Sequence, residues 1–133
     1  MAKRTSRNKN SVVNIGFVGT GRMGANMARN LKEKGFKISS VFDVKQSIAK
    51  KLAKELGCSA SKDLAGVTAS SDVVVTVVTD DKSMLSIYKK RGDSLLVNAK
   101  KTTFINCATI SPATHVEIER RAEDVGAKSL EGC

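Results

Sequence analysis

Three glycines at a fixed spacing form the part of this sequence that is best suited to hold a ligand. They lie in Gly19-Thr-Gly-Arg-Met-Gly24, directly after a short apolar segment and directly before an amphipathic one. In this pattern the first glycine allows a tight turn, the second lets a phosphate approach the backbone, and the third lets a helix pack closely on a strand. The residues predicted to form the resulting pyrophosphate site are Gly19, Gly21, Arg22, Met23 and Gly24.

The segment after the glycines adds a second reason to expect an anion there. A helix that begins near Arg22 presents free N–H groups and the positive end of its dipole to a phosphate. Arg22 and Met23 supply two of those N–H groups. We expect the Arg22 side chain to face either the ligand or solvent, and the Met23 side chain to pack in the core.

An acidic residue makes the glycine pattern more specific. Asp43 follows the apolar segment 37–42, about 20 residues after the last glycine. A carboxylate there accepts hydrogen bonds from both hydroxyls of an adenine ribose and repels a 2′-phosphate. The predicted cofactor is therefore NAD, and NADP is less favoured although the cation of Lys45 lies nearby. The alternative is a glycine-rich turn in an unrelated α/β fold.

Other candidate residues follow later apolar segments. Ligands of open parallel sheets bind beyond the carboxyl ends of the strands. Val78 and Thr79 end the continuous apolar run 72–78, which is typical of a strand buried on both faces. Both are therefore predicted to lie beside the cofactor. Thr109 follows segment 102–107 and is predicted either to reach the nicotinamide side or to be a loop hydroxyl.

For three further polar residues we favour a structural role over a role in ligand binding or catalysis. Asp80 and Asp81 precede a predicted helix and are expected to cap it. His115, which is the only histidine, falls in the first turn of a helix that begins near Pro112. We expect His115 to be solvated rather than to carry a proton.

Apolar segments of strand length alternate with segments of helical periodicity along the chain. Strands are predicted at 12–18, 37–42, 58–60, 72–78, 102–107 and 127–130, with helices or helical turns between them. This alternation implies right-handed crossovers and a parallel sheet that is covered on both faces. The predicted fold is an α/β, doubly wound, mostly parallel sheet of the Rossmann type over residues 12–133, preceded by a basic flexible tail at 1–11.

Composition restricts the class of protein further. The chain has 133 residues and a net charge of +10, and its basic tail contributes part of that charge. Nucleic acid is a possible partner on this ground but is not favoured. No membrane partner is expected, because no segment approaches the roughly 20 apolar residues of a membrane helix. Three widely spaced cysteines indicate reduced thiols inside a cell, and none has the spacing of a metal ligand, so no metal is predicted.

The sequence resembles the β-hydroxyacid dehydrogenase family, which includes 3-hydroxyisobutyrate dehydrogenase. The resemblance lies in Ile15-Gly-Phe-Val-Gly-Thr-Gly-Arg-Met-Gly24, Met27-Ala-Arg-Asn-Leu31 and Phe104-Ile-Asn-Cys-Ala-Thr-Ile-Ser-Pro112. It implies the NAD-binding domain of an enzyme that oxidises a small 3-hydroxy acid. It also adds Ser83 to the cofactor contacts already named.

Some features of the family differ here or are absent. Many relatives have Leu-Pro where this chain has Val78-Thr79, and Ser-Ser-Thr where it has Cys107-Ala108-Thr109. The family's substrate motif Ser-Gly-Gly, its catalytic lysine and its helical C-terminal domain have no counterpart in these residues. We therefore name no catalytic residue and expect an inactive fragment of a longer protein. The resemblance implies a homo-oligomer at full length, in the cytoplasm or in mitochondria.

Two other functions remain open from the sequence. One is a non-catalytic module that senses nucleotides or associates with nucleic acid, which the net positive charge favours. The other is a reductase of imines or semialdehydes that uses the same cofactor domain. Nothing in these residues separates the second alternative from the hydroxy-acid function, because substrate specificity lies in the part of the family that has no counterpart here.

Overall fold

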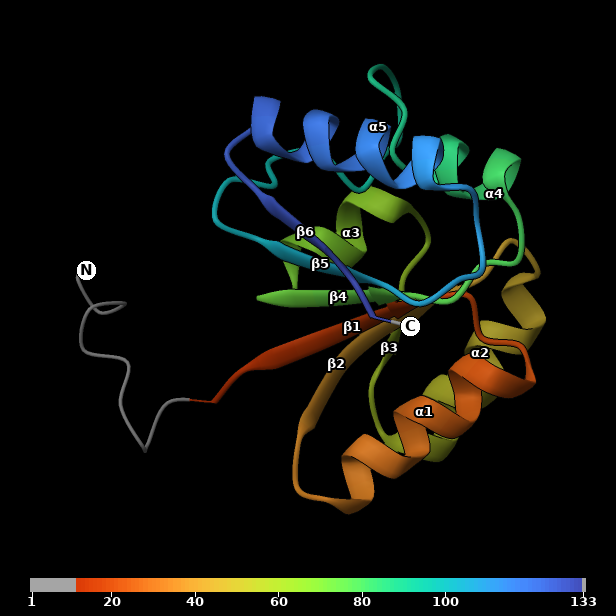
Figure 1. Ribbon diagram of the computed structural model, residues 1–133. Helices are drawn as coiled ribbons and strands as arrows, with labels where there is room; N and C mark the ends of the chain where they lie inside the picture. Colours follow the sequence, from red (N-terminus) through yellow and green to blue (C-terminus); the bar gives the residue numbers. More distant parts are fainter. Residues whose placement is uncertain (1–11, 133) are drawn as a thin grey trace.

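The computed structural model describes residues 12–132, so the predicted tail at 1–11 lies outside the described residues. Six strands form one sheet in the order β3-β2-β1-β4-β5-β6, and every neighbouring pair is parallel (Figure 1). The strands are β1 (Asn14–Val18), β2 (Lys37–Phe42), β3 (Ser59–Ala60), β4 (Val73–Thr76), β5 (Thr103–Asn106) and β6 (Lys128–Glu131). The helices are α1 (Arg22–Glu33), α2 (Gln46–Leu56), α3 (Leu64–Ala69), α4 (Asp81–Ile87) and α5 (Pro112–Asp124).

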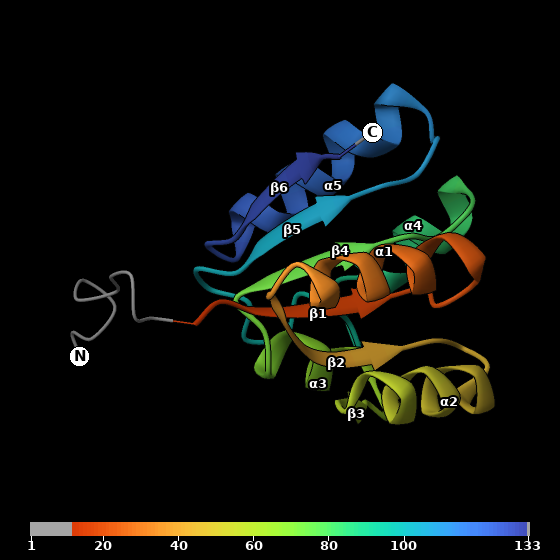
Figure 2. The same ribbon diagram turned by 90° about the horizontal axis from the view of Figure 1, so that it is seen from below.

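Helices cover both faces of the sheet, as the alternating pattern predicts. Helices α1 and α2 lie on one face and α3, α4 and α5 lie on the other (Figures 1 and 2). Phe17, Ala28 and Val41 belong to the apolar core under α1 and α2. Phe104 and Ile118 belong to the core under the other three helices. The structure thus confirms the doubly wound α/β fold, which is here entirely parallel.

The order of the strands places a crevice beside β1, at the carboxyl ends of the strands. Strand β1 pairs with β2 on one side and with β4 on the other, so the chain changes direction across the sheet at this point. Ligands of doubly wound sheets bind in such a crevice, beyond the carboxyl ends of the strands. The glycine segment, which follows β1 directly, therefore lies at the expected position.

Two ends of elements differ from the prediction. The helix that the sequence pattern predicts over residues 82–90 ends at Ile87. Tyr88 follows this end, and its side chain is fully buried in the core. There its ring packs edge-on against Phe104, with ring centroids 5.2 Å apart. The sequence pattern also predicts Val125 on the inner face of the last helix, but Val125 follows the end of α5 and is 36% exposed.

Candidate functional site

The three glycines of the motif have different surroundings. Gly19 has a φ of +95°, and a Cβ atom added there would meet the carbonyl oxygen of Val77 at 2.5 Å. A Cβ atom on Gly24 would overlap the carbonyl oxygen of Gly19. Both positions therefore require glycine for reasons that belong to the fold itself.

Gly21 is different, because nothing lies within 4 Å of the position its Cβ atom would occupy. Its φ of −68° and ψ of −168° are ordinary extended backbone. Gly21 is also the N-cap of α1, where no side chain caps the helix and no acidic residue lies in the first turn. The first N–H groups of α1 thus have no side-chain cap and the space beside Gly21 is open, which fits the approach of an anionic group.

Asp43 is held firmly beside this loop. Its Oδ2 atom accepts hydrogen bonds from the backbone N–H of Thr20 at 2.8 Å and from the Thr20 hydroxyl at 3.2 Å. Its Oδ1 atom accepts from the backbone N–H of Lys45 at 2.9 Å. Each carboxylate oxygen has about two acceptor sites, so Oδ1 keeps capacity for a ligand hydroxyl. The carboxylate thus links the glycine loop to the end of β2 and remains able to bind.

A cleft of about 470 Å³ opens at the carboxyl ends of β1, β2 and β4. Carbon-rich side chains form part of its walls, among them Val44 and Ile48 from the segment after β2. The predicted site residues that the structure brings together in its lining are Gly19, Gly21, Asp43, Val78, Thr79 and Ser83. The cleft therefore unites residues from three separate parts of the chain, within 18–21, 42–48 and 77–87.

The other predicted site residues lie outside the lining of this cleft. Gly24 packs beneath the loop, and Arg22 lies exposed at the start of α1. Met23 is 64% exposed, so the prediction of a core side chain is wrong: the inner face of α1 is formed by Ala25 and Ala28 instead. Thr109 is exposed in the loop after β5.

Of the two acidic residues after β4, Asp80 has the expected capping role and Asp81 does not. Asp80 is the N-cap of α4, and its carboxylate accepts from the backbone N–H of Ser83 at 2.7 Å. That hydrogen bond lowers the pKa of Asp80. Asp81 accepts instead from the backbone N–H of Ser111 at 2.9 Å, so it ties the start of α4 to the loop after β5.

His115 was expected to be solvated, and this prediction is wrong. Its side chain is only 12% exposed, and Nε2 lies 3.3 Å from the Glu131 carboxylate of β6. Sheet pairing explains the difference, because β6 lies next to β5 at the edge of the sheet and contacts α5. His115 lines none of the cofactor cleft.

A buried polar network behind the cleft was not predicted from the sequence. The Asn106 Oδ1 atom accepts from the hydroxyls of Thr76 at 2.7 Å and Tyr88 at 2.6 Å, and Asn106 Nδ2 donates to the Ser129 hydroxyl at 2.8 Å. Burial raises the pKa of the Tyr88 phenol, so this group stays neutral and donates. The only available signal was a single asparagine inside an apolar run. The network connects the carboxyl ends of β4 and β5 to Ser129 of β6.

The described residues show neither a metal-binding cluster nor a membrane-spanning helix. Among residues 12–132, no three His, Cys, Asp or Glu side chains are grouped so as to hold a metal ion. Over the same residues, no helix has the length and apolar character needed to cross a membrane.

The parallel sheet in this strand order, with a glycine loop and an acidic residue at its crevice, defines a dinucleotide-binding domain of the Rossmann class. A family described as the NAD binding domain of 6-phosphogluconate dehydrogenase matches residues 14–132. The chain belongs to this family.

Comparisons with individual proteins point to related dehydrogenases. The chain is 29% identical over 126 residues to a probable mitochondrial 3-hydroxyisobutyrate dehydrogenase of Arabidopsis thaliana, covering 93% of this chain and 36% of the relative. It is similar to the structure of Mycobacterium tuberculosis 3-hydroxyisobutyrate dehydrogenase with L-serine, at 28% identity and a TM-score of 0.79, covering 90% of this chain and 40% of that one. An imine reductase from Pseudomonas sp. has a TM-score of 0.80 at 18% identity, over 91% of this chain and 41% of that one, which shows the shared fold alone. The chain thus spans little more than a third of the relatives it matches by sequence.

Proposed function

We propose that this chain binds NAD in the cleft beyond β1, β2 and β4, as the cofactor domain of an oxidoreductase that acts on a small 3-hydroxy acid. The observation that carries the proposal is the open space at Gly21. Gly19 and Gly24 are required by the fold, whereas Gly21 is required only if a ligand approaches its backbone. Family membership supports the dinucleotide, and the dehydrogenases among the relatives support the substrate class.

The residues of the cleft fit the parts of a dinucleotide. The pyrophosphate would lie at the N-terminus of α1 over Gly21, where no side chain caps the first N–H groups. The Asp43 carboxylate would accept hydrogen bonds from the adenine ribose, and Ile48 offers an apolar wall beside it. Thr109 lies one strand further along the sheet and would face the nicotinamide end. When bound, the cofactor supplies a hydride acceptor.

The substrate and the catalytic group belong to a longer parent protein in this proposal. L-serine, the compound named with the mycobacterial structure, is itself a 3-hydroxy acid. A lysine outside these residues would handle the hydroxyl proton in the parent. The mitochondrial relatives support one of the two compartments that we propose, the mitochondrion and the cytoplasm.

We expect the purified 133-residue chain to bind NAD weakly and to oxidise no 3-hydroxy acid. The reason is that none of the predicted contacts of the cleft matches the catalytic lysine that the resemblance to the dehydrogenase family implies. Absorbance of reduced nicotinamide, followed with 3-hydroxyisobutyrate and with L-serine, measures turnover. Oxidation of either compound at an enzymic rate would contradict the assignment of catalysis to a longer parent.

Replacing Gly21 with alanine should weaken NAD binding about tenfold or more, because the methyl group enters the space proposed for the pyrophosphate. The free energy of unfolding should change by less than about 1 kcal/mol, since alanine accepts this backbone conformation and loses only some preference at an N-cap. Isothermal calorimetry with NAD and urea unfolding measure the two effects. Gly35→Ala is the control for NAD binding: this glycine lies outside the cleft lining, so its replacement should lower stability because its φ is +96°, but should leave NAD affinity unchanged. A Gly21→Ala variant that binds NAD as tightly as the parent would remove the main support for the proposal.

A further inference from the structure

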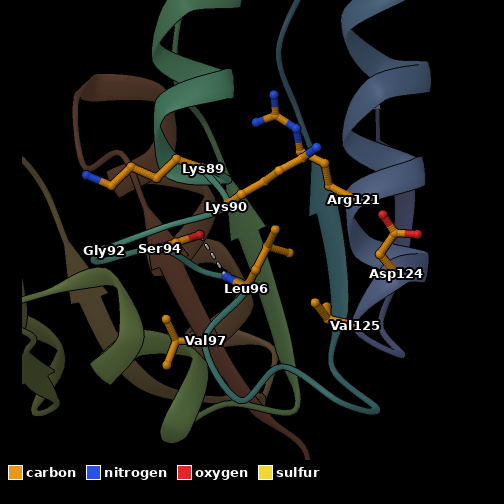
Figure 3. A pocket seen from close by; sticks show the side chains of 9 residues that line it. All are labelled: Lys89, Lys90, Gly92, Ser94, Leu96, Val97, Arg121, Asp124 and Val125. Carbon is orange, nitrogen blue, oxygen red and sulfur yellow. Dashed lines mark hydrogen bonds between the residues drawn. The ribbon is translucent and has the colours of Figure 1, made fainter.

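A second cavity lies beyond the end of α4, and it shares no lining residue with the cofactor cleft (Figure 3). Its volume is about 280 Å³, and its walls come from the segment after α4 and from the last turn of α5 with the residue that follows it. Carbon atoms of Leu96, Val97 and Val125 form one part of the lining. The cationic side chains in the lining are Lys89, Lys90 and Arg121.

Arg121 is fixed in place by the protein and still has donors to spare. Its Nε donates to the Glu117 carboxylate at 2.6 Å, and its Nη1 donates to the Tyr88 carbonyl at 3.1 Å. The side chain is 19% exposed. Within residues 12–132, Nη2 has no hydrogen-bond partner, so this part of the guanidinium keeps its donors for a ligand of the cavity that Arg121 lines.

The carboxylates near the cavity are already engaged. Glu117 pairs with both Arg120 and Arg121, and its hydrogen bonds to them lower its pKa to about 2. Asp124, which itself lines the cavity, lies 3.4 Å from Arg120 and leaves the three cations of the lining with one carboxylate among them. Asp93, on the same loop as the lysines, accepts from the first backbone N–H groups of α3.

The two lysines have no such compensation. Within the described part of the chain, neither Lys89 nor Lys90 forms an ion pair with a carboxylate. Figure 3 shows Lys90 extending toward Arg121, while Lys89 points to the outer side of the loop. The carbonyls of Leu85 and Tyr88 at the end of α4 accept hydrogen bonds from Arg121 Nη1. The cavity therefore has a surplus of positive charge next to an apolar wall.

We propose that this cavity binds a small phosphomonoester with a short apolar body. A phosphomonoester carries close to two negative charges at neutral pH, which matches the Lys90 and Arg121 donors with Lys89 at the rim. A guanidinium presents planar, directed donors that suit phosphate oxygens. The apolar side chains would contact the organic part, and the small volume limits the ligand to a compact molecule. A polynucleotide could also supply a phosphate group, and the experiment below distinguishes it from a small phosphomonoester.

Phenyl phosphate, titrated into the ¹⁵N-labelled full chain and followed by NMR, tests the proposal. We expect saturable shifts of amide signals in segment 89–97 and at the end of α5, with weaker binding of inorganic phosphate, which lacks an apolar body. The double variant Lys89→Gln/Lys90→Gln should bind phenyl phosphate about tenfold or more weakly, because it loses two charge-assisted contacts. Lys50→Gln/Lys51→Gln, which removes an adjacent exposed pair from α2, is the matched control and should bind as the parent does.

Several outcomes would overturn the proposal. One is the absence of saturable shifts in segment 89–97, and another is an equal loss of affinity in both double variants, which would reflect net charge alone. Tighter binding of a short oligonucleotide than of phenyl phosphate at the same signals would indicate a nucleic-acid surface instead. Shifts confined to residues 19–24 would place the phosphate at the glycine loop, and would bear on the NAD site rather than on this cavity.

Discussion

Replacing Gly24 with alanine is expected to lower the free energy of unfolding by about 2 kcal/mol. The added methyl group would overlap the carbonyl oxygen of Gly19, which is backbone and cannot rotate away as a side chain would. Helix α1 would therefore have to move away from the loop that precedes it, and overpacking of this kind costs roughly 1–3 kcal/mol or more. The better helix propensity of alanine returns up to about 1 kcal/mol, so the loss observed is a net value.

Urea unfolding of the parent and of Gly24→Ala measures this difference. Gly21→Ala is the matched control, because it adds the same methyl group three residues earlier, where nothing lies within 4 Å. We expect a large loss of stability for the first variant and a small one for the second. A Gly24→Ala variant with the stability of the parent would show that the contact between α1 and the loop relaxes freely, contrary to this interpretation.

Replacing Asp43 with asparagine is expected to weaken NAD binding by about 10- to 100-fold, the range for losing hydrogen bonds to a charged group. NADP binding should fall less, because the same change removes the repulsion of a 2′-phosphate. The preference for NAD over NADP should therefore narrow. Calorimetric titration of both dinucleotides at two salt concentrations gives the two affinities and identifies any contribution from overall charge.

The asparagine variant also loses structural hydrogen bonds, so it needs a control that loses similar ones. Asp43 accepts from the backbone N–H groups of Thr20 and Lys45, and Asp93 accepts from those of Leu64 and Ala65. Asp93→Asn should therefore reduce stability without changing the affinity for NAD. Equal effects of the two variants on NAD binding, or none for Asp43→Asn, would exclude Asp43 from the cofactor site.

The three glycines acquire separate meanings when sequence and structure are considered together. The spacing alone assigns a role to each, but it does not show which roles the protein needs in the absence of a ligand. The structure shows that Gly19 and Gly24 serve the fold and that only Gly21 has unexplained space. Function can therefore be tested at Gly21 with little interference from stability.

Much of the fold and part of the site could be predicted from the sequence. Continuous apolar runs and helical periodicity place the strands and helices in order, and the alternation leads to the parallel sheet. The capping role of Asp80 is also predictable, because its partner Ser83 is three residues away. These features depend on neighbours within a few residues, which a pattern in the sequence records directly.

The predictions that were wrong depend on contacts between elements that are far apart in the sequence. The exposure of Met23 and the burial of His115 depend on which elements the sheet order brings beside them, and the inner face of α1 is already filled by alanines. A helical periodicity shows that a face exists, but it does not show how far the neighbouring element covers that face.

The sequence by itself determined the order of the elements, the glycine turn and the acidic residue after the second strand. Each of these depends on the types and spacing of residues that are close together in the chain. Only the tertiary structure decided what these residues contact. It showed that the glycine loop donates a hydrogen bond to Asp43 through the backbone of Thr20. It also showed that Asn106 links three strands, and that Lys89, Lys90 and Arg121 line one cavity. The physical reason is that these contacts join residues far apart in the chain, and their pairing is set by the packing of strands and helices.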